Sequence, residues 1–168
     1  MRGRISFQER SCESVFRHGG TLDKYLGDGF MATFGATDDH LDPSSLALAC
    51  AFDLKKEIEQ WNAERQRLEA APVRVSIGVH SGDVLVGSLG SDQRIEFTVV
   101  GDVVNVASRL EETTRGLGCT IIASEDCVTM AGTINAEGLF CRRNEVKLRG
   151  LSREIRVYLD CEMEPLSL

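Results

Sequence analysis

The most regular pattern of apolar and polar positions lies in the second quarter of the chain. Asp42 and Pro43 supply a capping side chain and a first-turn proline. The apolar residues that then recur at the spacing of one helix face are Ala47, Ala51, Leu54, Ile58 and Trp61. We therefore expect a long amphipathic helix over residues 44–68. A shorter helix over residues 5–17 is expected to end at the pair of glycines that follows it.

Two segments show the pattern of β-hairpins. Between residues 21 and 35, two short apolar runs flank Gly27-Asp28-Gly29, which predicts two strands with Asp28 at the tip of their turn. Over residues 73–79, apolar residues alternate with polar or small ones, as in a half-buried strand. Ser81-Gly82-Asp83 is expected to turn that strand into a partner at residues 84–86, which would form a second hairpin.

The C-terminal half alternates short strands with helices. A strand over residues 94–100 is expected to lead into a helix that begins at Gly101 and Asp102. The elements expected after it are a strand at 120–123, a helix at 124–130 capped by Ser124, and strands near Leu139, at 145–148 and at 154–159. Helices interleaved with strands, several of them joined by hairpins, predict an α+β fold with a mostly antiparallel or mixed sheet.

The helix after Gly101 carries two polar side chains that need an explanation. Asp102 is expected to cap it, and the apolar residues around it predict that it lies largely buried. Asn105 and Arg109 lie one turn apart and project from one face. Burying an unpaired polar group costs about 1–3 kcal/mol, and a charge costs more. A polyanionic ligand at that face would satisfy both side chains.

Composition narrows the classes of partner. The chain has 168 residues with 19 basic and 26 acidic side chains, and its net charge of -7 argues against a general nucleic-acid or anionic-membrane surface. No apolar run approaches the ~20 residues of a membrane span, so a cytoplasmic location is expected. The six cysteines include no Cys-x-x-Cys pair, so neither a zinc site nor a disulfide framework is indicated, and we expect them reduced.

Three motifs in order carry a family resemblance. They are Lys-Tyr-Leu-Gly-Asp-Gly-Phe-Met-Ala-Thr-Phe-Gly at 24–35, Val-Ser-Ile-Gly-Val-His-Ser-Gly-Asp at 75–83, and the run from Thr98 to Leu110. Together they resemble the catalytic domain of class III nucleotidyl cyclases. The resemblance implies a single domain over residues 1–168 with a cyclase fold related to the ferredoxin-like fold. It also implies conversion of ATP to 3′,5′-cyclic AMP and pyrophosphate.

The hairpin and the strand before the helix hold the positions that match the family's metal and base contacts. Asp28 matches a metal-binding aspartate, and a carboxylate at an open turn can be approached by a hydrated ion. Lys24 and Thr98 match the pair that selects the base, in the combination of a bacterial-type, adenine-selecting subgroup. Taken alone, Gly-Asp-Gly is more often a plain turn, Lys24 a solvated lysine and Thr98 an ordinary strand residue.

The remaining matches concern the ribose and the phosphates. Asn105 and Arg109 match the pair that holds the ribose and the triphosphate, where a guanidinium fork can neutralise phosphate charge. Lys147 aligns with a lysine that contacts the terminal phosphates, and Arg149 is a competitor for that role. Arg94 lies where relatives often carry a further basic contact. Outside the family context, each would be read as a solvated surface residue.

The resemblance also implies a cofactor and partners. Two magnesium or manganese ions, roughly 3.5 to 4 Å apart, would assist the attack of the ribose hydroxyl. The site would lie between two protomers, with Asp28 from one and Lys24, Thr98, Asn105, Arg109 and Lys147 from the other. We therefore expect a homodimer, with a sensor or regulatory domain in a longer chain.

One feature of the family is missing from the sequence. The first metal-binding aspartate of the family lies on an opening strand, and no aspartate precedes Gly19 here. Two close dications need shared negative ligands, so metal binding should suffer, and a sheet edge should lack its partner. Either the chain is a fragment of a longer cyclase or it is degenerate, and we favour a fragment. The alternatives to an adenylate cyclase are a non-catalytic nucleotide-binding or dimerisation module, or a guanylate cyclase.

Overall fold

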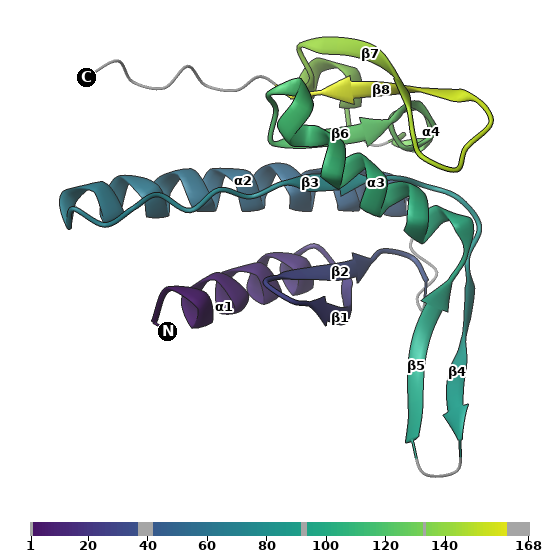
Figure 1. Ribbon diagram of the computed structural model, residues 1–168, viewed down its shortest axis with the longest axis horizontal. Helices are drawn as coiled ribbons and strands as arrows, with labels where there is room; N and C mark the ends of the chain where they lie inside the picture. Colours follow the sequence, from purple (N-terminus) through teal and green to yellow (C-terminus); the bar gives the residue numbers. More distant parts are fainter. Residues whose placement is uncertain (1, 37–41, 92–93, 133, 161–168) are drawn as a thin grey trace.

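The computed structural model describes residues 2–36, 42–91, 94–132 and 134–160 (Figure 1). Its helices are α1 (Arg2–Arg17), α2 (Pro43–Arg67), α3 (Asp102–Leu117) and α4 (Glu125–Met130), with one 3₁₀ turn, η1 (Ala136–Leu139). Its strands are β1 (Thr21–Leu26), β2 (Gly29–Thr33), β3 (Ile77–Val79), β4 (Leu85–Ser91), β5 (Arg94–Val100), β6 (Ile121–Ser124), β7 (Arg142–Lys147) and β8 (Glu154–Leu159). The expected α+β class is confirmed.

The strands form three sheets in the described part of the chain. A four-stranded sheet has the order β3-β6-β8-β7, in which β3 and β6 are parallel and the other pairs antiparallel. The antiparallel hairpins β1–β2 and β4–β5 are separate from it. Among the described residues, β2 and β3 each have one edge without a strand partner.

The prediction of a second hairpin, formed by residues 73–79 and 84–86, is wrong. β3 pairs with β6, and β4 pairs with β5, so residues 81–84 join two different sheets. β3 is also shorter than the alternating pattern of residues 73–79 predicted. The reason is that the Asn62 side chain on α2 binds both backbone groups of Val73. Its Nδ2 donates to the carbonyl and its Oδ1 accepts from the amide, each at 2.8 Å. Val73 and Val75 pack against α2 instead of pairing with a strand.

Two further expectations are corrected in the C-terminal half. The strand near Leu139 is the 3₁₀ turn η1. Gly101 caps α3 without a side-chain hydrogen bond, and Asp102 is the first helical residue. Only Val106, Leu110 and Thr114 are buried on that helix, so it is half-exposed rather than largely buried.

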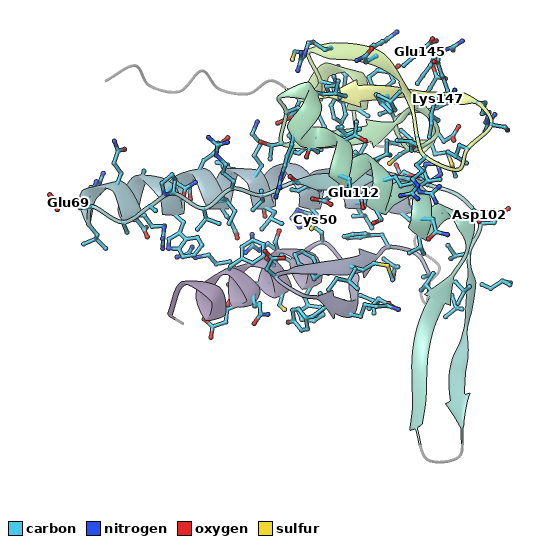
Figure 2. All side chains as sticks on the ribbon, in the orientation of Figure 1. Cys50, Glu69, Asp102, Glu112, Glu145 and Lys147 are labelled. Atoms are coloured by element: carbon cyan, nitrogen blue, oxygen red, sulfur yellow. The ribbon has the colours of Figure 1, made fainter. Side chains whose placement is uncertain are left out.

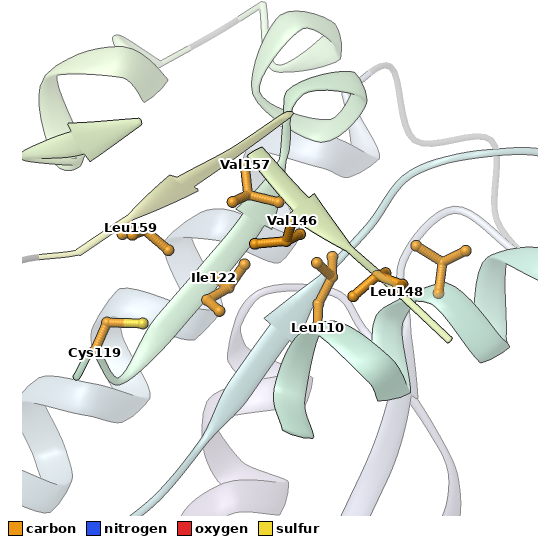
Figure 3. Packing of buried hydrophobic residues seen from close by; sticks show 8 residues of the cluster. Leu110, Cys119, Ile122, Val146, Leu148, Val157 and Leu159 are labelled. Carbon is orange, nitrogen blue, oxygen red and sulfur yellow. The ribbon is translucent and has the colours of Figure 1, made fainter. Parts of the chain in front are cut away.

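The main hydrophobic core lies between α3 and the four-stranded sheet (Figure 3). Leu110, Ile122 and Leu159 are fully or almost fully buried in it. A second cluster joins α2 and α4 around Leu48 and Cys127, and the third lies on α2 around Trp61. α3 is therefore fixed through its apolar face, which leaves the opposite face open to solvent.

The β4–β5 hairpin projects away from the rest of the molecule (Figure 1). Leu85 and Val100, at its base, are 79% and 48% exposed. Large apolar side chains exposed on a projecting hairpin suit a surface that a second protein covers.

The cysteines of the described residues are not all in the same state. Cys12, Cys50, Cys119 and Cys127 are free thiols, whereas Cys141 is disulfide-bonded, so the expectation of reduced cysteines is wrong at that position. In the described ranges, no helix combines the length and apolar character that crossing a membrane requires.

α4 begins as predicted, and its cap involves a histidine. The Ser124 hydroxyl accepts a hydrogen bond from the amide of Cys127 at 3.2 Å, and His80 Nδ1 lies 2.7 Å from the same oxygen. Burial lowers the pKa of His80, and the charge of Asp126 only partly offsets that effect. The imidazole is therefore held neutral against the start of α4.

This arrangement predicts a stability that depends on pH. Because the folded-state pKa of His80 is below its ordinary value, the unfolded chain takes up the proton first as the pH falls. The contribution of His80 is complete above the ordinary pKa and is lost as the pH falls toward the lower value. Urea unfolding at about pH 7.5 and about pH 5.5 should show a smaller pH effect for His80→Gln than for the wild type. Equal pH effects in the two proteins would contradict this assignment.

Candidate functional site

The β1–β2 hairpin presents Asp28 on an open turn. Gly27 and Asp28 form a two-residue connection between paired residues Leu26 and Gly29. Gly27 takes a φ of 65°, which glycine adopts without strain. Asp28 is exposed, so the predicted position of this carboxylate at the hairpin tip is confirmed.

Lys24 lies on β1, close to its neighbour in sequence. Its Nζ atom is 3.3 Å from Oδ2 of Asp23, and the lysine side chain is 43% exposed while the aspartate is 5% exposed. The other carboxylate oxygen of Asp23 accepts a hydrogen bond from the backbone amide of Val99 on β5, at 3.3 Å. Thr98 directly precedes Val99, so the two predicted base-contacting positions belong to neighbouring, connected strands.

Arg109 lies against the loop that follows β7. A Cβ atom added at Gly150 would be 3.3 Å from both Nη atoms of Arg109, so the guanidinium lies against this glycine. Gly150 also takes a φ of 80°, which disfavours any side chain there. Lys147 ends β7 three residues earlier and is exposed, and Figure 2 shows it toward the same end of the molecule as Asp102.

Asn105 occupies the open face of α3, one turn before Arg109. It is exposed, whereas Arg109 is half-buried. The premise that both polar groups are buried is therefore wrong, because α3 buries only the side that faces the sheet. An exposed amide and a half-buried guanidinium on one face still suit a ligand that approaches from solvent.

Glu111 is a residue of this region that the sequence did not single out. Burial raises its pKa, and a hydrogen bond with Ser76 opposes that rise. The charge of Asp28 contributes to the rise, so the hairpin tip lies near the C-terminal half of α3. A glutamate two residues after Arg109 gives no sequence signal of its own, since only the tertiary fold brings it toward Asp28.

The predicted site residues thus fall into two groups. One comprises the hairpin with Lys24 and Asp28, and the other comprises Asn105 and Arg109 with the loop after Lys147. Thr98 and Arg94 lie on β5, but their side chains are outside the described residues. A separate surface cavity of about 350 Å³ lies between α4 and β7–β8, and no predicted site residue lines it.

The described residues hold one clear metal-ligand candidate, Asp28. No group of three or more histidine, cysteine, aspartate or glutamate side chains lies close enough to hold an ion in the ranges given above. A pair of ions would need more carboxylates than these residues supply. The donor set does not fit the two-metal centre that the family implies, and we derive no chemical step through a metal.

Comparison with known proteins identifies the family. The family model described as the adenylate and guanylate cyclase catalytic domain matches residues 17–160. The chain belongs to this family. All three sequence motifs lie inside the matched range, so the family assignment and the site geometry refer to the same residues.

Relatives of this cyclase domain include two curated bacterial proteins. It is 36% identical over 152 residues to an adenylate cyclase of Anabaena cylindrica, covering 87% of this chain and 29% of the relative. It is 33% identical over 112 residues to adenylate cyclase 1 of Rhizobium meliloti, covering 67% of this chain and 17% of the relative. The chain thus spans less than a third of the length of these relatives.

Solved structures give the same fold. A guanylyl cyclase matches with a TM-score of 0.78 and 26% identity, covering 96% of this chain and 80% of that one. The adenylyl cyclase CyaB from P. aeruginosa also matches with a TM-score of 0.78, at 22% identity, and covers 95% of this chain and 80% of that one. The predicted cyclase fold is confirmed, and its neighbours include cyclases for both bases.

Proposed function

We propose that this cyclase domain acts on ATP and forms 3′,5′-cyclic AMP and pyrophosphate. The observation that carries the proposal is the placement of the Arg109 guanidinium against Gly150, three residues after Lys147 in the chain, and on the same helix face as Asn105. In this proposal, Arg109 and Lys147 supply cations for the phosphates, and Asn105 supplies an amide that can orient the ribose. The reaction is attack of the ribose 3′-hydroxyl on the α-phosphate, with pyrophosphate as the leaving group.

Each residue has a role that follows from its chemistry. Arg109 presents paired N–H donors to phosphate oxygens and offsets the charge that moves toward the leaving pyrophosphate. Lys147 adds a second positive charge for the terminal phosphates, and Asn105 orients the ribose without ionising. Holding the hydroxyl in line with the α-phosphate supplies much of the rate enhancement in such a reaction. Arg94 is assigned a further phosphate contact.

Adenine is the preferred base in this proposal. Lys24 offers a donor to a ring-nitrogen acceptor of adenine, whereas a carboxylate at this position would suit the donors of guanine. Thr98 supplies the second contact, as in the bacterial-type subgroup that the sequence resembles. The relatives from Anabaena cylindrica and Rhizobium meliloti are both named adenylate cyclases, which favours the same base.

A homodimer completes the proposed site. Asp28 of one copy would face Lys24, Asn105 and Arg109 of the other, which gives two equivalent sites for a two-fold pair. The projecting β4–β5 hairpin, with exposed Leu85 and Val100, is the surface that we assign to this pairing. Asp28 would bring one carboxylate to each of these two sites.

A second candidate function is a nucleotide-binding module without cyclase activity. It is favoured by the single metal-ligand candidate among the described residues. The two candidates differ in one readout. Incubating the protein with ATP and Mn²⁺ should release cyclic AMP and pyrophosphate in equal amounts if it is a cyclase. Saturable ATP binding without either product would favour the binding module, and GTP turnover above ATP turnover would overturn the base assignment.

Arg109 provides the sharpest test of the phosphate assignment. Arg109→Ala should weaken ATP binding roughly ten- to a hundredfold, because hydrogen bonds to charged groups are worth about 1.5–3 kcal/mol. Arg109→Lys should recover part of the affinity, since it keeps the charge and loses the fork. Calorimetric titration measures both.

The matched control is Arg67→Ala, which removes an exposed arginine at the far end of α2. It should bind ATP as the wild type does. If Arg67→Ala and Arg109→Ala weaken binding equally, the effect is one of overall charge, and Arg109 has no specific role.

A further inference from the structure

A nearly buried carboxylate lies behind the base-selecting lysine. The Asp23 side chain is 5% exposed, although it lies on β1, in a hairpin whose residues are mostly half-buried or exposed. One of its oxygens is 3.3 Å from Nζ of Lys24, and the other accepts the backbone amide of Val99 at 3.3 Å. A single side chain therefore contacts both strands that carry the base-selecting positions.

A local irregularity of β1 makes this contact possible. Neighbouring side chains of a regular strand point to opposite faces, so residues 23 and 24 should diverge. The pairing of β1 with β2 shifts between Leu22 and Lys24, so Asp23 sits in a bulge. A bulge re-aims side chains, and here it lets the aspartate and the lysine meet.

We propose that Asp23 is a positioning residue that sets the base preference of the nucleotide site. Its carboxylate holds the Lys24 ammonium in one place and fixes β5 at Val99, the residue next to Thr98. The positions of Lys24 and Thr98 that contact the base are therefore kept at a constant distance from each other. This inference rests on the proposed function, because it assumes that Lys24 and Thr98 face the base.

The two side chains of this ion pair differ in exposure. Lys24 is 43% exposed and has a long, flexible side chain, so the contact with Asp23 restricts the positions that its ammonium can take. Asp23 is held by burial and by the Val99 amide, so it can act as the fixed member. A lysine held in one position discriminates between an acceptor and a donor on a base edge better than a mobile one.

The experiment compares ATP and GTP affinities in the same protein. Each nucleotide displaces a fluorescent ATP analogue from the wild type, from Asp23→Asn, from Lys24→Gln and from the double variant. Asp23→Asn keeps an acceptor for the Val99 amide and removes the charge that faces Lys24. The control is Glu13→Gln, which removes an exposed carboxylate from α1. A thermal unfolding curve confirms that each variant is folded.

We expect the ratio of ATP affinity to GTP affinity to fall about fivefold in Asp23→Asn, which corresponds to the free energy of one ion pair. In the Lys24→Gln background the same change should have no further effect, because Asp23 acts through Lys24. A ratio in Asp23→Asn equal to that of the wild type would overturn the inference. So would an equal loss for both nucleotides that adds to the effect of Lys24→Gln, since that is the signature of a purely structural role.

Two remaining outcomes are also decisive. If Asp23→Asn unfolds, Asp23→Glu replaces it, because it keeps the charge and moves it by one methylene. A reduced ratio then supports the positioning role, and an unchanged ratio overturns it. If the wild type binds neither nucleotide, the proposed function fails before Asp23 is tested, so failure of the function is distinguishable from failure of this inference.

Discussion

Replacing Gly78 with alanine is expected to destabilise the protein by about 3 kcal/mol, at the upper end of the range for overpacking. Gly78 lies in β3, directly under α3. An added Cβ atom would overlap the carbonyl oxygen of Ala107 and lie 2.6 Å from the amide nitrogen of Glu111. Both are backbone atoms in the middle of a helix, so neither can move aside without moving α3.

The displacement of α3 should also reach the nucleotide site. Asn105 and Arg109 lie on the same helix, and the Arg109 guanidinium fits against Gly150 only while α3 keeps its place. Gly78→Ala should therefore weaken ATP binding in addition to lowering the unfolding temperature by roughly 6 to 12 °C. Differential scanning calorimetry and ATP titration measure the two effects.

Gly116 offers a matched control on the same helix. A Cβ atom added there would meet no atom within 4 Å beyond the adjoining backbone of its own helix, so Gly116→Ala adds the same methyl group without a clash. It should stabilise α3 by up to about 1 kcal/mol through helix propensity. An unchanged unfolding temperature in Gly78→Ala would show that β3 and α3 do not pack as described.

Asp160→Ala is expected to cost about 3–5 kcal/mol of stability, the range for breaking a buried ion pair. Asp160 is 1% exposed at the end of β8, and its Oδ1 accepts the backbone amides of Thr120 and Ile121 at 2.9 and 2.8 Å. Its Oδ2 is 2.5 Å from Nζ of Lys55 on α2. Alanine would leave two amides and a mostly buried ammonium without this partner.

Two variants separate the parts of this contact. Asp160→Asn keeps an acceptor for the amides and should cost less than Asp160→Ala. Glu59→Ala removes the second carboxylate near Lys55, at 3.7 Å, which is 44% exposed and should contribute less than about 1 kcal/mol. Urea unfolding measures all three. A loss in Asp160→Ala no larger than that in Glu59→Ala would contradict the role given to Asp160.

The sequence predicted correctly the elements whose caps and turns are formed by residues adjacent in the chain. The helix over residues 44–68 appears as Pro43–Arg67, and the Asp42 side chain accepts from the amide of Ser45 as a capping residue should. The Ser124 cap and the Asp28 turn were equally readable, since each depends on residues adjacent in sequence. These are the places where propensity and pattern agree with the fold.

Tertiary contacts decided the rest. The strand at residue 73 was lost because Asn62, eleven residues earlier, takes the backbone groups of Val73. The partner of β3 could not be read from its own turn, because β6 lies beyond α3 in sequence and pairs with it in parallel. Asp23 and Glu111 gave no signal, since their importance comes from neighbours that only the folded chain supplies.

We expect nucleotide to bind at the face formed by the β1–β2 hairpin, α3 and the loop after Lys147. Amide chemical shifts of the ¹⁵N-labelled chain, recorded during an ATP titration, test it directly. The largest shifts should fall at Lys24, Asp28, Asn105, Arg109 and Gly150, with smaller shifts for GTP at equal concentration. Shifts confined to the cavity between α4 and β7–β8, or no shifts at saturating ATP, would contradict the account.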